Sequence, residues 1–192
     1  MVNPENPTRA VVNEQKFDDN AKASTAITIS RPGNADLTGG GFTGGSASIS
    51  NTGAATGTFT VNNIGAVSAA AGQNLKVSFY FSPDATFGDA NDLFLGNQFI
   101  TLAQGIPGNG NFAGNYNFSL FQTDASDPSV RSEYVTYWAQ RGSVGTKVSG
   151  FIGMIIDPSS LILDANRINN KNQGVNKDRV AIDVTIAAGT TT

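Results

Sequence analysis

The stretch "LKVSFYFS", residues 75–82, alternates apolar and polar side chains along its whole length. Val77, Phe79 and Phe81 fall on one side of an extended chain, because successive side chains of a strand point to opposite faces. Such alternation is typical of an antiparallel sheet that has one face in the core. The stretch therefore predicts a β-strand whose phenylalanine face is buried.

Similar period-two patterns recur along the chain, separated by turns rich in Gly, Asn and Pro. No stretch shows the sustained spacing of three and four residues that a long helix needs. The glycines at 39–45 indicate a flexible or tightly turning loop. We therefore predict an all-β, immunoglobulin-like Greek-key β-sandwich. The expected strands are 23–30, 45–51, 56–63, 75–82, 94–103, 114–123, 133–140, 147–157 and 178–186.

The composition of the 192-residue chain excludes several kinds of activity. It has 22 glycines and only 14% charged residues, and no Lys- or Arg-rich block points to a nucleic acid. No apolar run is long enough to insert into a membrane. Because cysteine and histidine are absent, the chain has no disulfide, no thiolate or imidazole metal site and no Ser-His-Asp triad. An acid-pair hydrolase is the enzyme class left, but no pair of carboxylates stands out. We expect no enzymatic activity.

The segment "SPDATFGDANDLFLG", residues 82–96, places three aspartates after the expected strand. Asp84, Asp89 and Asp92, with the amide of Asn91, offer the hard oxygen ligands that calcium prefers. The spacing is not that of an EF-hand. The alternative is structural, since Asp84 and Asp92 also suit Asx-turns and loop capping. Both interpretations remain open from the sequence.

The N-terminal segment echoes the end of the chain. "NPTRAVVNEQKFDDN" (6–20) aligns without gaps with "DPSSLILDANRINNK" (157–171), and a strand-like run follows each copy. We therefore divide the chain into an N-terminal hairpin or strand segment at 1–33, a sandwich at 34–187 and a tail at 188–192. A lone hairpin is marginal in water, so the segment is expected to pair with a sheet edge in its own chain or in a neighbour. The candidate pairing residues are Ala10, Val11, Val12 and Phe17.

The stretch 59–96 and the stretch 150–170 together resemble the CARDB family, the cell-adhesion-related domain found in bacteria. The first carries that family's turn, strand and aspartate pattern, and the second carries its "D…N-x-x-N-N" ending, although Asp164 and Arg167 stand where Glu is usual. The segment 104–148 is longer than the family's compact middle. The matching residues are Val61, Asn63, Gly65, 77–82, Asp84, Asp92, Gly96, Asp157, Asn166, Asn169 and Asn170.

The resemblance implies an immunoglobulin-like, non-catalytic module at the cell surface or outside the cell, used in adhesion or as a structural spacer. A variant of this hypothesis is a subunit that assembles with copies of itself into a fibre or tube, linked through its N-terminal strand and stabilised by calcium. The alternative is a carbohydrate-binding module, in which exposed aromatic rings would stack on a glycan. The candidate rings are Tyr116, Tyr134, Tyr137 and Trp138.

Overall fold

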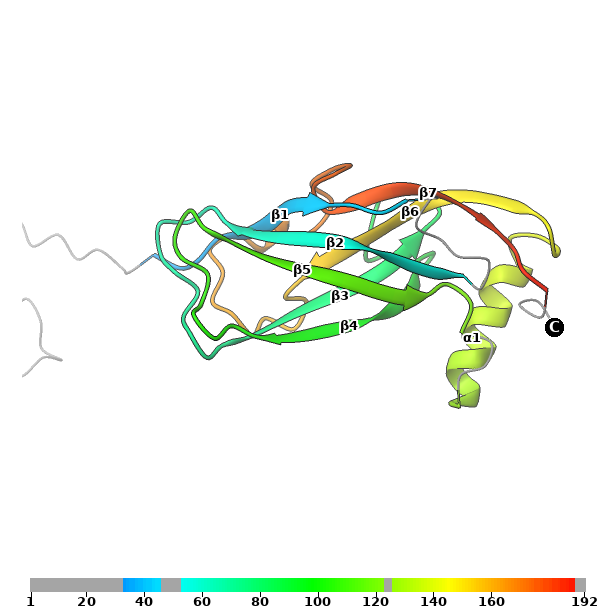
Figure 1. The fold of residues 1–192 in the computed structure, drawn as a ribbon, viewed down its shortest axis with the longest axis horizontal. Coiled ribbons are helices and arrows are strands. Elements are labelled where there is room, and N and C mark those ends of the chain that lie inside the picture. Colours follow the sequence, from blue (N-terminus) through cyan, green and yellow to red (C-terminus); the bar gives the residue numbers. More distant parts are fainter. Residues whose placement is uncertain (1–32, 46–52, 123–125, 189–192) are drawn as a thin grey trace, which may run out of the picture. The chain divides into compact units, whose positions relative to one another are not determined.

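The computed structural model describes residues 33–45, 53–122 and 126–188, which form two antiparallel sheets packed as a sandwich (Figure 1). One sheet has the strand order β1-β2-β5 and the other has the order β4-β3-β6-β7. The chain crosses between the sheets after β2, β4 and β5. This arrangement confirms the predicted immunoglobulin-like Greek-key sandwich. The elements are β1 Leu37–Phe42, β2 Ala54–Asn63, β3 Asn74–Ser82, β4 Leu93–Thr101, β5 Asn111–Ser119, α1 Pro128–Ala139, β6 Lys147–Ile156, a 3₁₀ helix Arg167–Asn170 and β7 Arg179–Thr185.

The core lies between the inner faces of the two sheets. Val77, Phe79 and Phe81 of β3 are fully buried, as the alternation of "LKVSFYFS" predicted. Phe79 meets Phe59 of β2 edge to face, with the ring centroids 5.3 Å apart, so the central strands of the two sheets are locked ring against ring. Burying one such ring contributes about 1.5–3 kcal/mol.

The glycine-rich segment expected to be a loop forms strand β1, so that part of the prediction is wrong. Leu37 and Phe42 of β1 are buried, and the strand pairs with β2 through an irregularity in register between Gly39 and Gly41. A Cβ at Gly39 would lie 2.8 Å from the carbonyl oxygen of Lys177. The glycine is therefore what lets the backbone of another segment approach β1.

The stretch 133–140, expected to be a strand, belongs to helix α1, and that prediction is wrong. Asp127 caps the helix, its carboxylate accepting a hydrogen bond from the Ser129 backbone N–H at 2.9 Å, and Pro128 occupies the first turn. The buried side chains of Tyr134, Tyr137 and Trp138 follow at helical spacing. Figure 1 shows α1 at the end of the sandwich where β5 ends.

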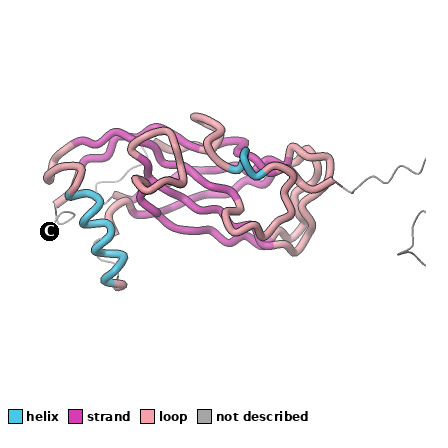
Figure 2. Tube along the Cα trace, turned by 180° about the vertical axis from the view of Figure 1, so that it is seen from behind, coloured by secondary structure: helices cyan, strands magenta, loops and turns pink. Residues whose placement is uncertain are grey.

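The described part of the chain starts at one end of the sandwich and finishes at the other (Figure 1). Near its start, Ala35 pairs with Asp164, and near its finish Ile186 donates a hydrogen bond to Thr146, close to the end of α1. Figure 2 shows from behind that loops gather at the end opposite α1. No helix within the described ranges is long and apolar enough to cross a membrane. The expected strands 23–30 and 45–51 lie wholly or largely outside the described residues, and the domain boundaries at 33 and 187 remain predictions.

Candidate functional site

The aspartate loop after β3 is anchored on the outer face of its sheet by one aromatic ring. Phe87 is fully buried although it belongs to the loop. Its ring lies over Gly153 of β6, where a Cβ would come within 2.5 Å of the ring carbon Cζ. Asn172 holds the same residue by its backbone, accepting from the Phe87 N–H at 2.8 Å and donating to its carbonyl at 3.3 Å. The loop is therefore fixed to the sheet at its middle.

The carboxylates of this loop are engaged by donors within the loop. Asp84 accepts hydrogen bonds from the Thr86 backbone N–H at 2.7 Å and from the Asn91 amide at 3.0 Å. The bond from Thr86 is the main reason why the pKa of Asp84 lies below its usual range. Asp89 accepts from the Asn91 backbone N–H at 3.1 Å. These are the Asx-turn contacts that the structural interpretation predicted.

Asp92 differs from its neighbours because it is partly buried. One carboxylate oxygen, Oδ2, accepts from the Gly88 N–H at 2.6 Å. The other, Oδ1, is buried and has no hydrogen-bond partner among the described residues. Burial is the main reason why the pKa of Asp92 is raised. The Oδ1 atom of Asp92 is therefore a buried oxygen without a hydrogen-bond donor among the described residues.

Helix α1 borders the same loop. The Arg141 guanidinium lies 3.3 Å from the centroid of the Tyr137 ring and donates to the Asn91 carbonyl at 2.9 Å. The Tyr137 hydroxyl is buried without a hydrogen-bond partner in the described part of the chain, and burial raises its pKa. Asp92, Asp84 and Asp89 all raise it further, which shows that their charges lie near this hydroxyl.

The four candidate calcium ligands thus share one loop but do not converge on one point. No three acidic side chains among the described residues lie close enough to hold a metal ion. The oxygen atoms of this loop are of the kind that a hard cation takes, and Asp92 Oδ1 is buried without a hydrogen-bond partner among the described residues. To bind one cation together, the three carboxylates would have to move closer to one another. The calcium assignment remains a prediction.

The aromatic residues expected as glycan platforms lie in the core, so that prediction is wrong. Trp138 is fully buried and its indole N–H donates to the Leu120 carbonyl at 2.7 Å. The Tyr134 hydroxyl donates to the Phe94 carbonyl at 2.6 Å, and the Tyr116 hydroxyl donates to the Thr43 carbonyl at 2.7 Å. Rings held this way close the end and side of the sandwich and offer no face for stacking.

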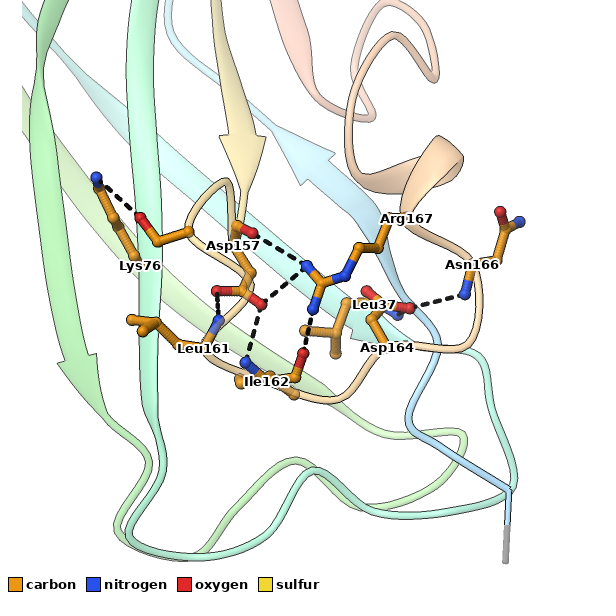
Figure 3. A network of polar contacts seen from close by, with 9 residues as sticks. Leu37, Lys76, Asp157, Leu161, Ile162, Asp164, Asn166 and Arg167 are labelled. Carbon is orange, nitrogen blue, oxygen red and sulfur yellow. Dashed lines mark hydrogen bonds and ion pairs between the residues drawn. The ribbon is translucent and has the colours of Figure 1, made fainter. Parts of the chain in front are cut away.

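A second polar cluster, which sequence reasoning did not recognise as a unit, follows the end of β6 (Figure 3). That strand ends on the side of the sandwich away from α1 (Figure 1). The fully buried Asp157 carboxylate accepts from the backbone N–H groups of Leu161 at 2.8 Å and Ile162 at 2.9 Å. Arg167 pairs with the same carboxylate at 3.2 Å and also donates to the Ile162 carbonyl. The sequence signal for this turn was "DPSSLI", in which an aspartate precedes turn-forming residues. In the structure, Asp157 has a positive φ of 44°. The cluster holds the 157–167 loop in one shape.

The candidate pairing residues Ala10, Val11, Val12 and Phe17 lie outside the described residues, so the structure places none of them. Asn169 and Asn170, which belong to the motif in 150–170, end the 3₁₀ helix and are buried. The Asn169 amide donates to the Asp36 carboxylate at 2.7 Å, which ties the motif in 150–170 to the residue just before β1.

No family model and no curated protein matches the chain. Among solved structures, the chain is similar to a CARDB domain from Pyrococcus furiosus that was solved in complex with di-metal ions. The two share 13% sequence identity with a TM-score of 0.42, and the match covers 85% of this chain and 99% of that one. It is similar to a domain of a predicted cell surface protein from Methanosarcina acetivorans at 15% identity and a TM-score of 0.41, covering 81% and 94%. A β-glucosidase from Streptomyces venezuelae matches at 13% identity and a TM-score of 0.38, over 79% of this chain and 15% of that one. CARDB domains are thus among the structures that this chain resembles, as the motifs predicted.

Proposed function

We propose that the chain is a non-catalytic structural and adhesive module that works outside the cell or at its surface. The path of the chain carries this proposal, because the described segment starts at one end of the sandwich and finishes at the other (Figure 1). Such a path lets modules join end to end with their strands along the direction of the array. Asp84, one carboxylate oxygen of Asp92 and the indole N–H of Trp138 are occupied by internal contacts. What the module offers to partners is its backbone edges and loops.

We further propose that the module assembles with copies of itself through its N-terminal segment. The sequence echo between 6–20 and 157–171 supports this, since equivalent segments are able to occupy equivalent places in adjacent copies. Replacing both Val11 and Val12 with lysine in the full chain is expected to remove the largest species in light scattering. The matched control replaces Glu14 and Gln15 with lysine in the same segment. Assemblies that persist in the valine variant would contradict the N-terminal link.

Calcium is the proposed stabilising ion, bound by Asp84, Asp89, Asn91 and Asp92. Because the loop must rearrange to bind it, we expect an affinity of the extracellular class, with a dissociation constant of about 0.1–1 mM. Calcium is expected to raise the melting temperature of the wild type and to leave that of Asp92→Asn unchanged. Asp183→Asn, which changes an exposed carboxylate on β7, is the matched control and should respond like the wild type. An equal response in all three proteins would place the ion elsewhere.

A further inference from the structure

The sandwich has four edge strands, and three of them are covered, charged or irregular. The edge of β1 is covered, since the Ala165 N–H donates to the Ala35 carbonyl at 2.7 Å and the Phe42 N–H donates to the Asn176 carbonyl at 3.1 Å. Strand β7 carries Arg179 and Asp183. Strand β4 shifts register against β3 beside Gly96. Coverage, charge and irregularity are the means by which natural proteins keep sheet edges from pairing.

Strand β5, Asn111–Ser119, lacks all three protections. Its sequence "NFAGNYNFS" contains no charged residue and no proline, and it pairs with β2 over nine residues without a shift in register. The other two strands of its sheet, "LTGGGF" and "AATGTFTVNN", are uncharged as well. An uncharged, regular edge of this length is a template for another strand.

The backbone groups that β5 presents outward follow from its pairing with β2. The Asn63 N–H donates to the Gly110 carbonyl at 2.8 Å and the Leu120 N–H donates to the Gly53 carbonyl at 2.9 Å. Even-numbered residues of β5 therefore point their backbone groups at β2, and the odd-numbered residues point theirs away from the sheet. Within the described ranges, one contact reaches those outward groups, from the Gln98 side-chain amide to the Asn115 carbonyl at 2.6 Å.

We propose that β5 pairs in antiparallel register with β5 of a second copy, centred on Asn115. The five outward residues are spaced symmetrically about this position, so that a two-fold axis pairs Asn115 with itself, Ala113 with Asn117, and Asn111 with Ser119. All these side chains are small and uncharged, and no like charges meet across the axis. The neutral Gln98 amide gives way to a backbone N–H of the partner strand. The product is a continuous six-stranded sheet shared by two copies.

This interface is independent of the proposed N-terminal link and is tested separately from it. The charged variants are made in the full-length chain that carries Val11→Lys and Val12→Lys, so that the N-terminal link does not contribute. In sedimentation velocity at about 100 µM this parent protein is expected to form a dimer. Asn115→Lys brings two lysines together on the axis and is expected to weaken the dimer at least about tenfold, as is Asn115→Asp. Thr56→Lys, which adds the same charge on the same face of β2 but away from the edge, should leave the dimer intact.

Mixing the two charged variants gives the decisive readout. Because residue 115 faces itself, a 1:1 mixture of Asn115→Lys and Asn115→Asp is expected to restore the dimer that neither variant forms alone. A monomeric parent protein, a dimer unchanged by Asn115→Lys, or a mixture that stays monomeric would each overturn the proposal. The Val11 and Val12 double variant should keep this dimer, so the failure of one interface is distinguishable from the failure of the other.

Discussion

Replacing Phe87 with alanine is expected to destabilise the fold although the residue belongs to a surface loop. The ring is fully buried over Gly153. Removing a buried phenylalanine costs about 3–5 kcal/mol, and the lower end applies here because a loop relaxes more easily than a core. A loss of about 3 kcal/mol corresponds to about 6–12 °C in melting temperature for a domain of this size. Urea unfolding followed by Trp138 fluorescence measures the loss. Phe99→Ala, at a position 69% exposed, is the matched control and should change the free energy of unfolding by less than about 0.5 kcal/mol.

A second substitution tests whether the ring occupies the space above Gly153. In the wild type, Gly153→Ala forces its new methyl group against the Phe87 ring and should destabilise. In the Phe87→Ala background the methyl group no longer meets the ring, so its cost should shrink. Part of the cost should remain, because the Cβ also lies 2.9 Å from the carbonyl oxygen of Asp178. The two substitutions are thus expected to be non-additive by about 1 kcal/mol or more. Additive effects, or a loss below about 1 kcal/mol for Phe87→Ala, would refute the anchoring role.

Three further predictions follow from single side chains. Asp157→Ala leaves two backbone N–H groups and the Arg167 guanidinium without their acceptor, and urea unfolding should show a loss of about 3–5 kcal/mol. The raised pKa of Asp92 means that the folded chain binds this proton more tightly than the unfolded chain, so the wild type loses stability as pH rises through that pKa. Asp92→Asn has no such proton to lose. In parallel denaturation curves it should therefore lose less stability than the wild type between about pH 4 and 7. Because Trp138 is buried, neutral oligosaccharides should leave its fluorescence unchanged, and quenching in a titration would revive the glycan hypothesis.

The strands that the sequence predicted well are those whose two faces differ in polarity. In β3 the alternation of Val77, Phe79 and Phe81 with more polar neighbours reports burial directly. In α1, several residues of "EYVTYWAQ" individually favour strands, and apolar side chains stand at both odd and even positions, so their spacing did not separate a strand from a helix. The better signal was the Asp127-Pro128 pair, which marks a helix start. Strand β1 was missed because Gly39 is explained by the close approach of the 177–178 segment, which is far away in the chain.

The same limit applies to the candidate site. The Asx-turn of Asp84 and the bond from the Gly88 N–H to Asp92 are local, and such roles were predictable from the residues themselves. The position of the loop was not, because it depends on Phe87 meeting Gly153 and on Asn172 reaching the loop backbone. The Asp157 cluster likewise combines a local turn with Arg167. Contacts between segments that are distant in the chain produce no periodic pattern in the sequence, so they could not be predicted from it.

The passage of the chain from one end of the sandwich to the other also determines how the module bears tension. A pull on its two ends acts along the strands, while the hydrogen bonds between strands lie across them, so a whole ladder is loaded in shear. The shortest terminal ladder is that of β1, which is interrupted between Gly39 and Gly41. Under increasing force, β1 should therefore slide from β2 and lengthen the module while the ring contacts between β2 and β3 remain closed.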